Sequence, residues 1–167
     1  MDPRYPIGSF VAPDSISDDQ VATWIERIES LPERLIDVVE ALPLDRLAQP
    51  YREGGWTRAQ VVHHLADSHM NSMTRFRWAL TEATPVIKAY DEAAWADLAD
   101  YSAPIGPSLD LLRALHARWV TLLRSLDAGQ LARSFIHPES GETIVLRSNI
   151  GIYAWHGDHH LAHLELD

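Results

Sequence analysis

The chain has 167 residues, of which 46% are hydrophobic, and its formal net charge is −10. A chain of this length fits a single domain, 1–167, with a hydrophobic core of its own. The negative charge argues against nucleic acid and anionic membrane surfaces as partners, because both attract basic proteins. No apolar run approaches the roughly 18 residues of a membrane span, and residues 1–6 do not resemble a signal peptide, so we expect a cytoplasmic protein. The chain has no cysteine, which excludes disulfides, thiolate ligands and a cysteine nucleophile.

The first long helix is predicted after an irregular, proline-containing arm formed by residues 1–16. Ser17 followed by Gln20 is the pattern of a helix start, and apolar residues then recur at helical spacing up to Pro43. Pro32 interrupts this stretch, so the sequence predicts either one kinked helix or two abutting helices.

A second long helix is predicted over 58–82, because Thr57 and Gln60 form another capping box and the stretch contains neither proline nor glycine. A long connection follows over 84–107, and a short helix is expected within it after Asp91.

The last third of the chain predicts two further helices with a β-hairpin between them. Ser108 is the expected cap of a helix with a leucine-rich face, and Ser148 is the expected cap of the final helix. Between them, residues 133–147 hold two short apolar runs around a Pro-Glu-Ser-Gly turn, which is typical of a hairpin. Amphipathic helices must bury their apolar stripes on one another, so the predicted fold class is all-α, a four-helix bundle with a small hairpin before the last helix.

The final helix carries the clearest functional signal. His156 and His160 are four residues apart, so their imidazoles project from one helical face at the spacing that binds one metal ion. His163 lies near the same face and could replace either of them. His159 points about 60° away from His156, given the helical repeat. A catalytic metal centre usually takes three protein ligands, so a third must come from elsewhere.

The third ligand is expected from the histidines of the second helix. Periodicity favours His64, leaves His69 as the alternative and places His63 outside the site. Asp67 could accept a hydrogen bond from a ligand imidazole, although a solvated carboxylate is the simpler reading.

The other sequence patterns carry weaker functional signals. The Tyr51–Trp56 segment precedes a helix start that could bind an anion, but a plain inter-helix loop explains it better. There is no Gly-x-Ser-x-Gly elbow and no His-Glu-x-x-His motif, so neither a serine hydrolase nor a zincin is indicated. No catalytic side chain beyond the metal ligands can be singled out.

Four strings together resemble the YfiT-like branch of the DinB superfamily. They are Tyr5-Pro6-Ile7-Gly8, the Pro50–Thr57 stretch with its Gly-Gly-Trp, the Val61–Ser72 stretch with His-His-Leu-Ala-Asp, and the histidine-rich Trp155–His163 stretch. The resemblance runs over essentially the whole chain.

This resemblance implies a four-helix bundle of DinB/YfiT-like type, a homodimer, and one zinc or nickel ion held by three histidines. The ligand before Leu-Ala-Asp is His64 here, and the His-x-x-x-His pair is His156 and His160. It also implies a metal-dependent enzyme with a small-molecule substrate. The preferred activity is a bacillithiol-type S-transferase that joins a low-molecular-weight thiol to an electrophile. A metal-dependent hydrolase is the alternative, and a non-catalytic metal-binding stress-response module is the third possibility.

Overall fold

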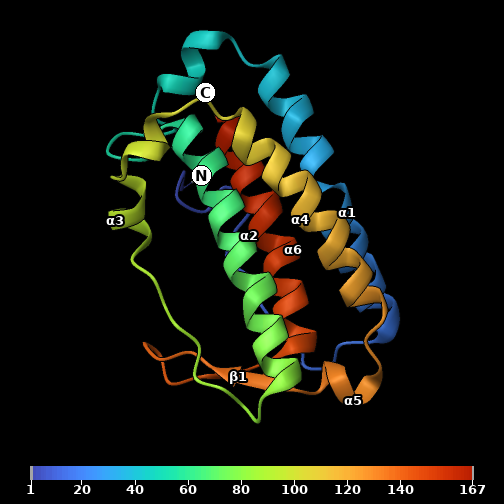
Figure 1. The fold of residues 1–167 in the computed structure, drawn as a ribbon. Helices are drawn as coiled ribbons and strands as arrows, with labels where there is room; N and C mark the ends of the chain where they lie inside the picture. The colour runs from blue at the N-terminus through green and yellow to red at the C-terminus, as the bar shows by residue number, and fades with distance from the viewer. Residues whose placement is uncertain (1, 167) are drawn as a thin grey trace.

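The computed structural model describes residues 2–166 and is built around four long helices. These are α1 (Asp18–Ala41), α2 (Arg58–Thr81), α4 (Gly106–Arg124) and α6 (Leu146–Leu164) (Figure 1). Each long helix packs on two neighbours, in the order α1, α6, α2, α4 around the bundle. The predicted all-α class and four-helix bundle are therefore confirmed.

The shorter elements lie in the connections. They are the 3-10 helices η1 (Leu44–Ala48) and η2 (Ala99–Ser102), the short helices α3 (Glu92–Ala96) and α5 (Ala128–Leu131), and the strands β1 (Ser134–Ile136) and β2 (Thr143–Val145). The two strands pair antiparallel, with Ser134 opposite Val145, which confirms the predicted hairpin. No helix in residues 2–166 is both long and apolar enough to cross a membrane.

The direction of the helices explains the long connection between α2 and α4. In Figure 1 the colours show α1 and α6 running one way, and α2 and α4 running the other way. Because α2 and α4 are parallel neighbours, residues 82–105 must return along the whole bundle. This return carries α3 and η2 past the side of α2, and it forms one wall of the pocket described below.

Several predicted local signals are confirmed. Ser17 accepts a hydrogen bond from the Gln20 backbone N–H at 3.1 Å, and Thr57 with Gln60 forms a full capping box. Pro32 lies inside a continuous α1, so the option of two abutting helices is wrong.

Two predicted caps are wrong. α4 begins at Gly106, two residues before Ser108, and the Ser108 hydroxyl instead lies 2.8 Å from Nδ1 of His63. α6 begins at Leu146 directly after β2, without a side-chain cap, so Ser148 lies inside the helix. Both helices begin without a side-chain cap, so a capping pattern cannot reveal where they start.

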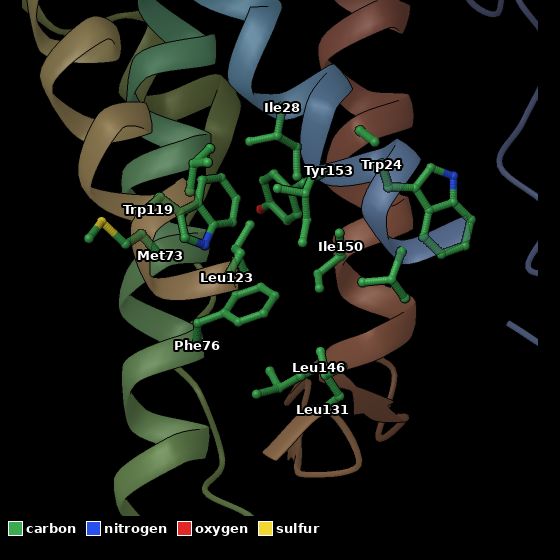
Figure 2. Close-up of a cluster of buried hydrophobic side chains, with 14 of the residues drawn as sticks. Trp24, Ile28, Met73, Phe76, Trp119, Leu123, Leu131, Leu146, Ile150 and Tyr153 are labelled. Atoms are coloured by element: carbon green, nitrogen blue, oxygen red, sulfur yellow. The ribbon is translucent and has the colours of Figure 1, made fainter. Parts of the chain in front are cut away.

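The buried apolar residues form two clusters at different heights of the bundle. The cluster next to the hairpin, here the hairpin-side cluster, contains Phe76, Trp119, Leu146 and Ile150 among others, as Figure 2 shows. The second, here the far cluster, includes Leu35, Val61, Leu65, Leu112 and Leu161. Each cluster takes side chains from all four long helices, which is why both hold the same bundle together.

A layer of polar side chains lies mostly between the two clusters, with His64 beside the far cluster on α2. On α2, for example, Ala66 belongs to the far cluster and Met73 to the hairpin-side cluster, with His69 between them. The layer, here the histidine layer, consists of His64 and His69 on α2, His116 on α4, and His156 and His160 on α6.

Candidate metal centre and its pocket

Three histidines of the layer bring one ligand nitrogen each to a common point. His64, His156 and His160 each offer a ring nitrogen, and these three atoms lie within 4.8 Å of one another. The Nε2 atoms of His64 and His156 are 3.3 Å apart. The i, i+4 spacing on α6 places two of the rings one turn apart, and α2 packs beside α6 to add the third.

The electrostatics keep these rings neutral. Burial lowers the pKa of His64 to about 4, and the nearby His163 lowers it further. Burial also lowers the pKa of His156 and of His160 well below the usual value, with neighbouring histidines adding to the shift. Neutral imidazole is the form that binds a metal. The three neutral imidazoles direct their lone pairs at one point, and a single shared proton cannot satisfy all three. A divalent cation can accept all three lone pairs, so the donor set fits such an ion.

The three rings line a pocket of about 460 Å³ that opens to the surface. Its walls come from four places: the N-terminal arm, the loop before α2, the start of α3 and the outer face of α6. Besides the three histidines, the lining residues are Arg4, Tyr5, Tyr51, Arg52, Gly54, Gly55, Trp56, Glu92, Trp155, His159 and His163.

Two charged side chains in this wall are available to a ligand. Nε of Arg52 is buried without a hydrogen-bond partner, although Nη1 donates to the Glu53 carbonyl at 2.9 Å. Burial raises the pKa of Glu92, and Arg75 partly offsets that shift. Arg4, by contrast, forms an exposed ion pair with Asp2 at 2.8 Å.

Aromatic rings pack against the histidines from the pocket side. The Tyr51 ring stacks on His163 with centroids 4.2 Å apart, and Trp56 lies 4.9 Å from His64. His163 in turn places its Nδ1 3.2 Å from Nδ1 of His160. These contacts restrict the imidazole rotamers and shield one side of the site from water.

The other histidines of α2 lie outside the cluster of three. His69 was the alternative ligand, but its Nε2 lies 3.3 Å from Nδ1 of His156, behind that ring. His63 faces Ser108 and the Ala103 carbonyl and is not one of the three clustered histidines. The Asp67 carboxylate accepts a hydrogen bond from the Tyr101 hydroxyl at 2.7 Å, so no ligand imidazole uses it in this structure.

Two further side chains of α6 have specific partners. The Asp158 carboxylate pairs with Arg27 and, at 2.7 Å, with Arg34 of α1. Trp155 lines the pocket, stacks on His159 with ring centroids 4.5 Å apart and donates to the Gly8 carbonyl at 3.1 Å.

Sequence reasoning missed most of the pocket wall. Glu92 lies in the long α2–α4 connection, far from both histidine stretches in sequence, and no spacing rule links it to them. Tyr51 and Arg52 belong to the segment that was read as a plain loop. The Gly-Gly pair beside them was the available signal, since Gly54 takes a positive φ of 65° that turns the chain over the pocket.

Comparisons with known proteins agree with this picture. The family model of the DinB superfamily matches residues 18–164. A protein of Oceanobacillus iheyensis, named as a candidate metal-dependent hydrolase, is 52% identical over 98% of this chain and 95% of its own length. A Bacillus cereus protein with the same kind of name is 52% identical over 98% of this chain and 94% of its own length.

Two solved structures share the architecture. YfiT from Bacillus subtilis, described as a probable metal-dependent hydrolase with an unusual four-helix bundle topology, superposes with a TM-score of 0.96 at 48% identity. The match covers 99% of this chain and 95% of that one. A second four-helix bundle protein matches with a TM-score of 0.60 at 22% identity, over 88% of this chain and 99% of its own, which shows a shared fold alone.

Proposed function

The chain belongs to the DinB superfamily, and on that premise we propose that it activates a small nucleophile at a metal ion held by His64, His156 and His160. The observation that carries the proposal is the convergence of three neutral imidazoles at the wall of an open pocket, with His64 and His160 buried and His156 half-buried. Three protein ligands leave a coordination position for substrate, and an all-nitrogen donor set suits zinc or nickel. A divalent ion there would lower the pKa of a water or thiol bound in that position.

The preferred reaction is the transfer of a small thiol to an electrophile. Its sulfur would form a bond to the electrophilic carbon, the leaving group would depart with the bonding electrons, and the thiol proton would be released. The chain has no cysteine, so the thiol must enter as a substrate. The pocket of about 460 Å³ is large enough for a small molecule, and Arg52 could bind a carboxylate on an anionic thiol such as bacillithiol.

Hydrolysis is the second candidate, and a specific observation favours it. Glu92 lines the same pocket and could act as a general base, and partial desolvation raises its pKa above the usual value. The names of the relatives point to the same chemistry for those proteins. In this reaction Glu92 would take a proton from the attacking water.

One experiment separates the two reactions. Metal-loaded protein is assayed for conjugation of a bacillithiol-type aminothiol to a simple electrophile, and for cleavage of a chromogenic ester without thiol. We expect conjugation, together with a sulfur-to-cobalt charge-transfer band when cobalt replaces the native ion, and we expect His156→Ala to abolish both. Thiol-free ester cleavage that thiols inhibit would instead establish the hydrolase.

Glu92→Gln sharpens this comparison. The S-transferase reading predicts that the variant keeps the charge-transfer band, because the histidines alone hold the ion. The hydrolase reading predicts a rate loss of about 10²–10⁴-fold, the usual contribution of a general base. Glu53→Gln is the matched control, because Glu53 is exposed and lies outside the pocket lining. The homodimer and the cytoplasmic location stay predictions.

A further inference from the structure

A chain of hydrogen-bonded histidines crosses the bundle behind the candidate metal site. Nδ1 of His156 lies 3.3 Å from Nε2 of His69, and Nδ1 of His69 lies 2.9 Å from Nε2 of His116. Nδ1 of His116 then lies 2.6 Å from the backbone carbonyl oxygen of Ile28. The four groups come from α6, α2, α4 and α1, so every long helix contributes one.

The Ile28 carbonyl fixes the donor-to-acceptor direction of every hydrogen bond in this chain of histidines. A carbonyl oxygen can only accept a hydrogen bond, so the Ile28 carbonyl requires a proton on Nδ1 of His116. His116 is 1% exposed, and burial lowers its pKa to about 4, so the ring is neutral at pH 7 and carries no second proton. Its Nε2 must therefore accept.

The same reasoning passes from ring to ring. Because Nε2 of His116 accepts, Nδ1 of His69 must donate to it. His69 is 0% exposed and packs among imidazole, Trp119 and Tyr153 rings, where a charged ring would be costly, so it is also neutral and its Nε2 must accept from His156. Nδ1 of His156 therefore holds the proton. This leaves Nε2 of His156 as a bare lone pair, and that atom faces Nε2 of His64 at 3.3 Å.

We propose that His69 and His116 are positioning residues that hold His156 in its Nδ1–H tautomer and keep its Nε2 lone pair directed at the metal position. The purpose of this arrangement depends on the proposed metal site, but the tautomers themselves do not require a bound ion. Histidine takes the part that a carboxylate or a backbone carbonyl usually plays behind a metal-bound imidazole.

In residues 2–166, neither of the other two candidate ligands is backed by a chain of histidines that crosses the bundle. Nδ1 of His64 is buried and has no hydrogen-bond partner in residues 2–166. Nδ1 of His160 lies 3.2 Å from Nδ1 of His163, whose side chain meets the backbone of Pro3 and Arg4 in the exposed N-terminal arm. His156 is therefore the ligand whose ring orientation and tautomer the fold specifies most completely.

The direct test reads the tautomers by nitrogen NMR of the metal-free, ¹⁵N-labelled protein at pH 7. Imidazole nitrogen shifts separate protonated from bare nitrogens. The expected result is Nδ1–H with a bare Nε2 in His69, His116 and His156. A proton on Nε2 of His69 or His116 would overturn the proposal. This NMR measurement needs neither a variant nor a bound metal. Its result therefore tests the tautomers even if the wild-type protein binds no ion and the proposed function fails.

Variants then connect the tautomers to metal binding. His116→Leu removes the acceptor of His69 and should weaken the Kd for zinc, measured by chelator competition, by about 10–100-fold. His116→Gln can donate to Ile28 and accept from His69, so it should restore most of the affinity and the Nδ1–H signal of His156.

The matched control is His63→Leu. His63 is also buried on α2 with both ring nitrogens engaged, but it lies outside the chain. We expect this variant to leave the zinc Kd and the His156 tautomer unchanged. If His63→Leu and His116→Leu weaken zinc binding equally, the effect is general to the packing and the positioning role is excluded.

Discussion

Along α2, His69 and Phe76 lie two turns apart and neither is exposed, yet different forces hold them. Phe76 belongs to the hairpin-side cluster, where its ring packs edge-on against Trp119 with centroids 5.7 Å apart. His69 belongs to the histidine layer, where both ring nitrogens must find a matching donor or acceptor. Apolar area stabilises Phe76 with any well-fitting neighbour, whereas His69 requires particular partners.

This difference separates two kinds of substitution. A change in the hairpin-side cluster should alter the free energy of unfolding and leave the metal site intact in the molecules that remain folded. A change in the histidine layer should alter metal binding more than the stability of the metal-free bundle, because the two apolar clusters on either side of the layer are untouched.

The largest expected stability effect is that of Phe76→Ala. Removing a fully buried aromatic ring leaves a cavity and should lower the free energy of unfolding by about 3–5 kcal/mol. Urea titration measures this loss, and metal analysis of the folded fraction should still give one ion per chain. A folded variant that has lost its metal would show that the cluster and the layer are not separable.

The next effect is that of removing the metal. Binding to the folded state alone stabilises it by about 4 kcal/mol when free metal is 1,000 times the Kd. A chelator should therefore lower the Tm while the helical circular dichroism at 25 °C persists. His64→Ala should show the low Tm with or without metal and bind far less than one ion per chain, and His159→Ala should behave as wild type. If His64→Ala retains the metal and His69→Ala loses it, the third ligand is His69 and not His64.

Acid should destabilise the metal-free protein through the histidine layer. Burial lowers the pKa of His116 from 6.5 to about 4 in the folded state. As the pH falls below 6.5 the unfolded chain takes up this proton first, so stability is lost between pH 6.5 and 4 at about 1.4 kcal/mol per pH unit. Chemical denaturation across this range should give a shallower slope for His116→Leu. An unchanged slope would mean that His116 is not held neutral.

The smallest effect tests a charge that lies between the two α6 ligands in sequence. Asp158→Asn weakens the partly exposed pairs with Arg27 and Arg34 and should cost about 1 kcal/mol. Zinc affinity should not change, because Asp158 faces α1 and contacts no histidine of the layer. A clear loss of zinc affinity would show that the Asp158 charge contributes to the electrostatics of the metal site.

The apolar clusters could be predicted from the sequence because helical periodicity alone marks the buried face. The i, i+4 pair on α6 was equally accessible, since its geometry is local to one helix. Choosing His64 over His69 was harder, because both lie on the buried side of α2 and the answer depends on how α2 sits against α6. The partners of His69 were beyond reach, since His116 carries no motif and the Ile28 carbonyl has no sequence signature.

The residues of the pocket wall were also difficult to predict from the sequence. Glu92 reaches the site only because two parallel neighbouring helices force a return connection along the bundle, and helix direction cannot be read from amphipathic stripes. The caps at Ser17 and Thr57 were predictable because they satisfy backbone groups within three residues. Those expected at Ser108 and Ser148 failed because α4 and α6 begin two residues earlier, at Gly106 and Leu146, without a side-chain cap.

Anomalous diffraction from crystals of the zinc-loaded protein, recorded above and below the zinc absorption edge, tests the central claim most directly. The account predicts one strong anomalous peak per chain, about 2.0–2.1 Å from one ring nitrogen of each of His64, His156 and His160. A peak bound by His69 or His163 in place of one of these three, or no ordered peak at zinc saturation, would contradict it.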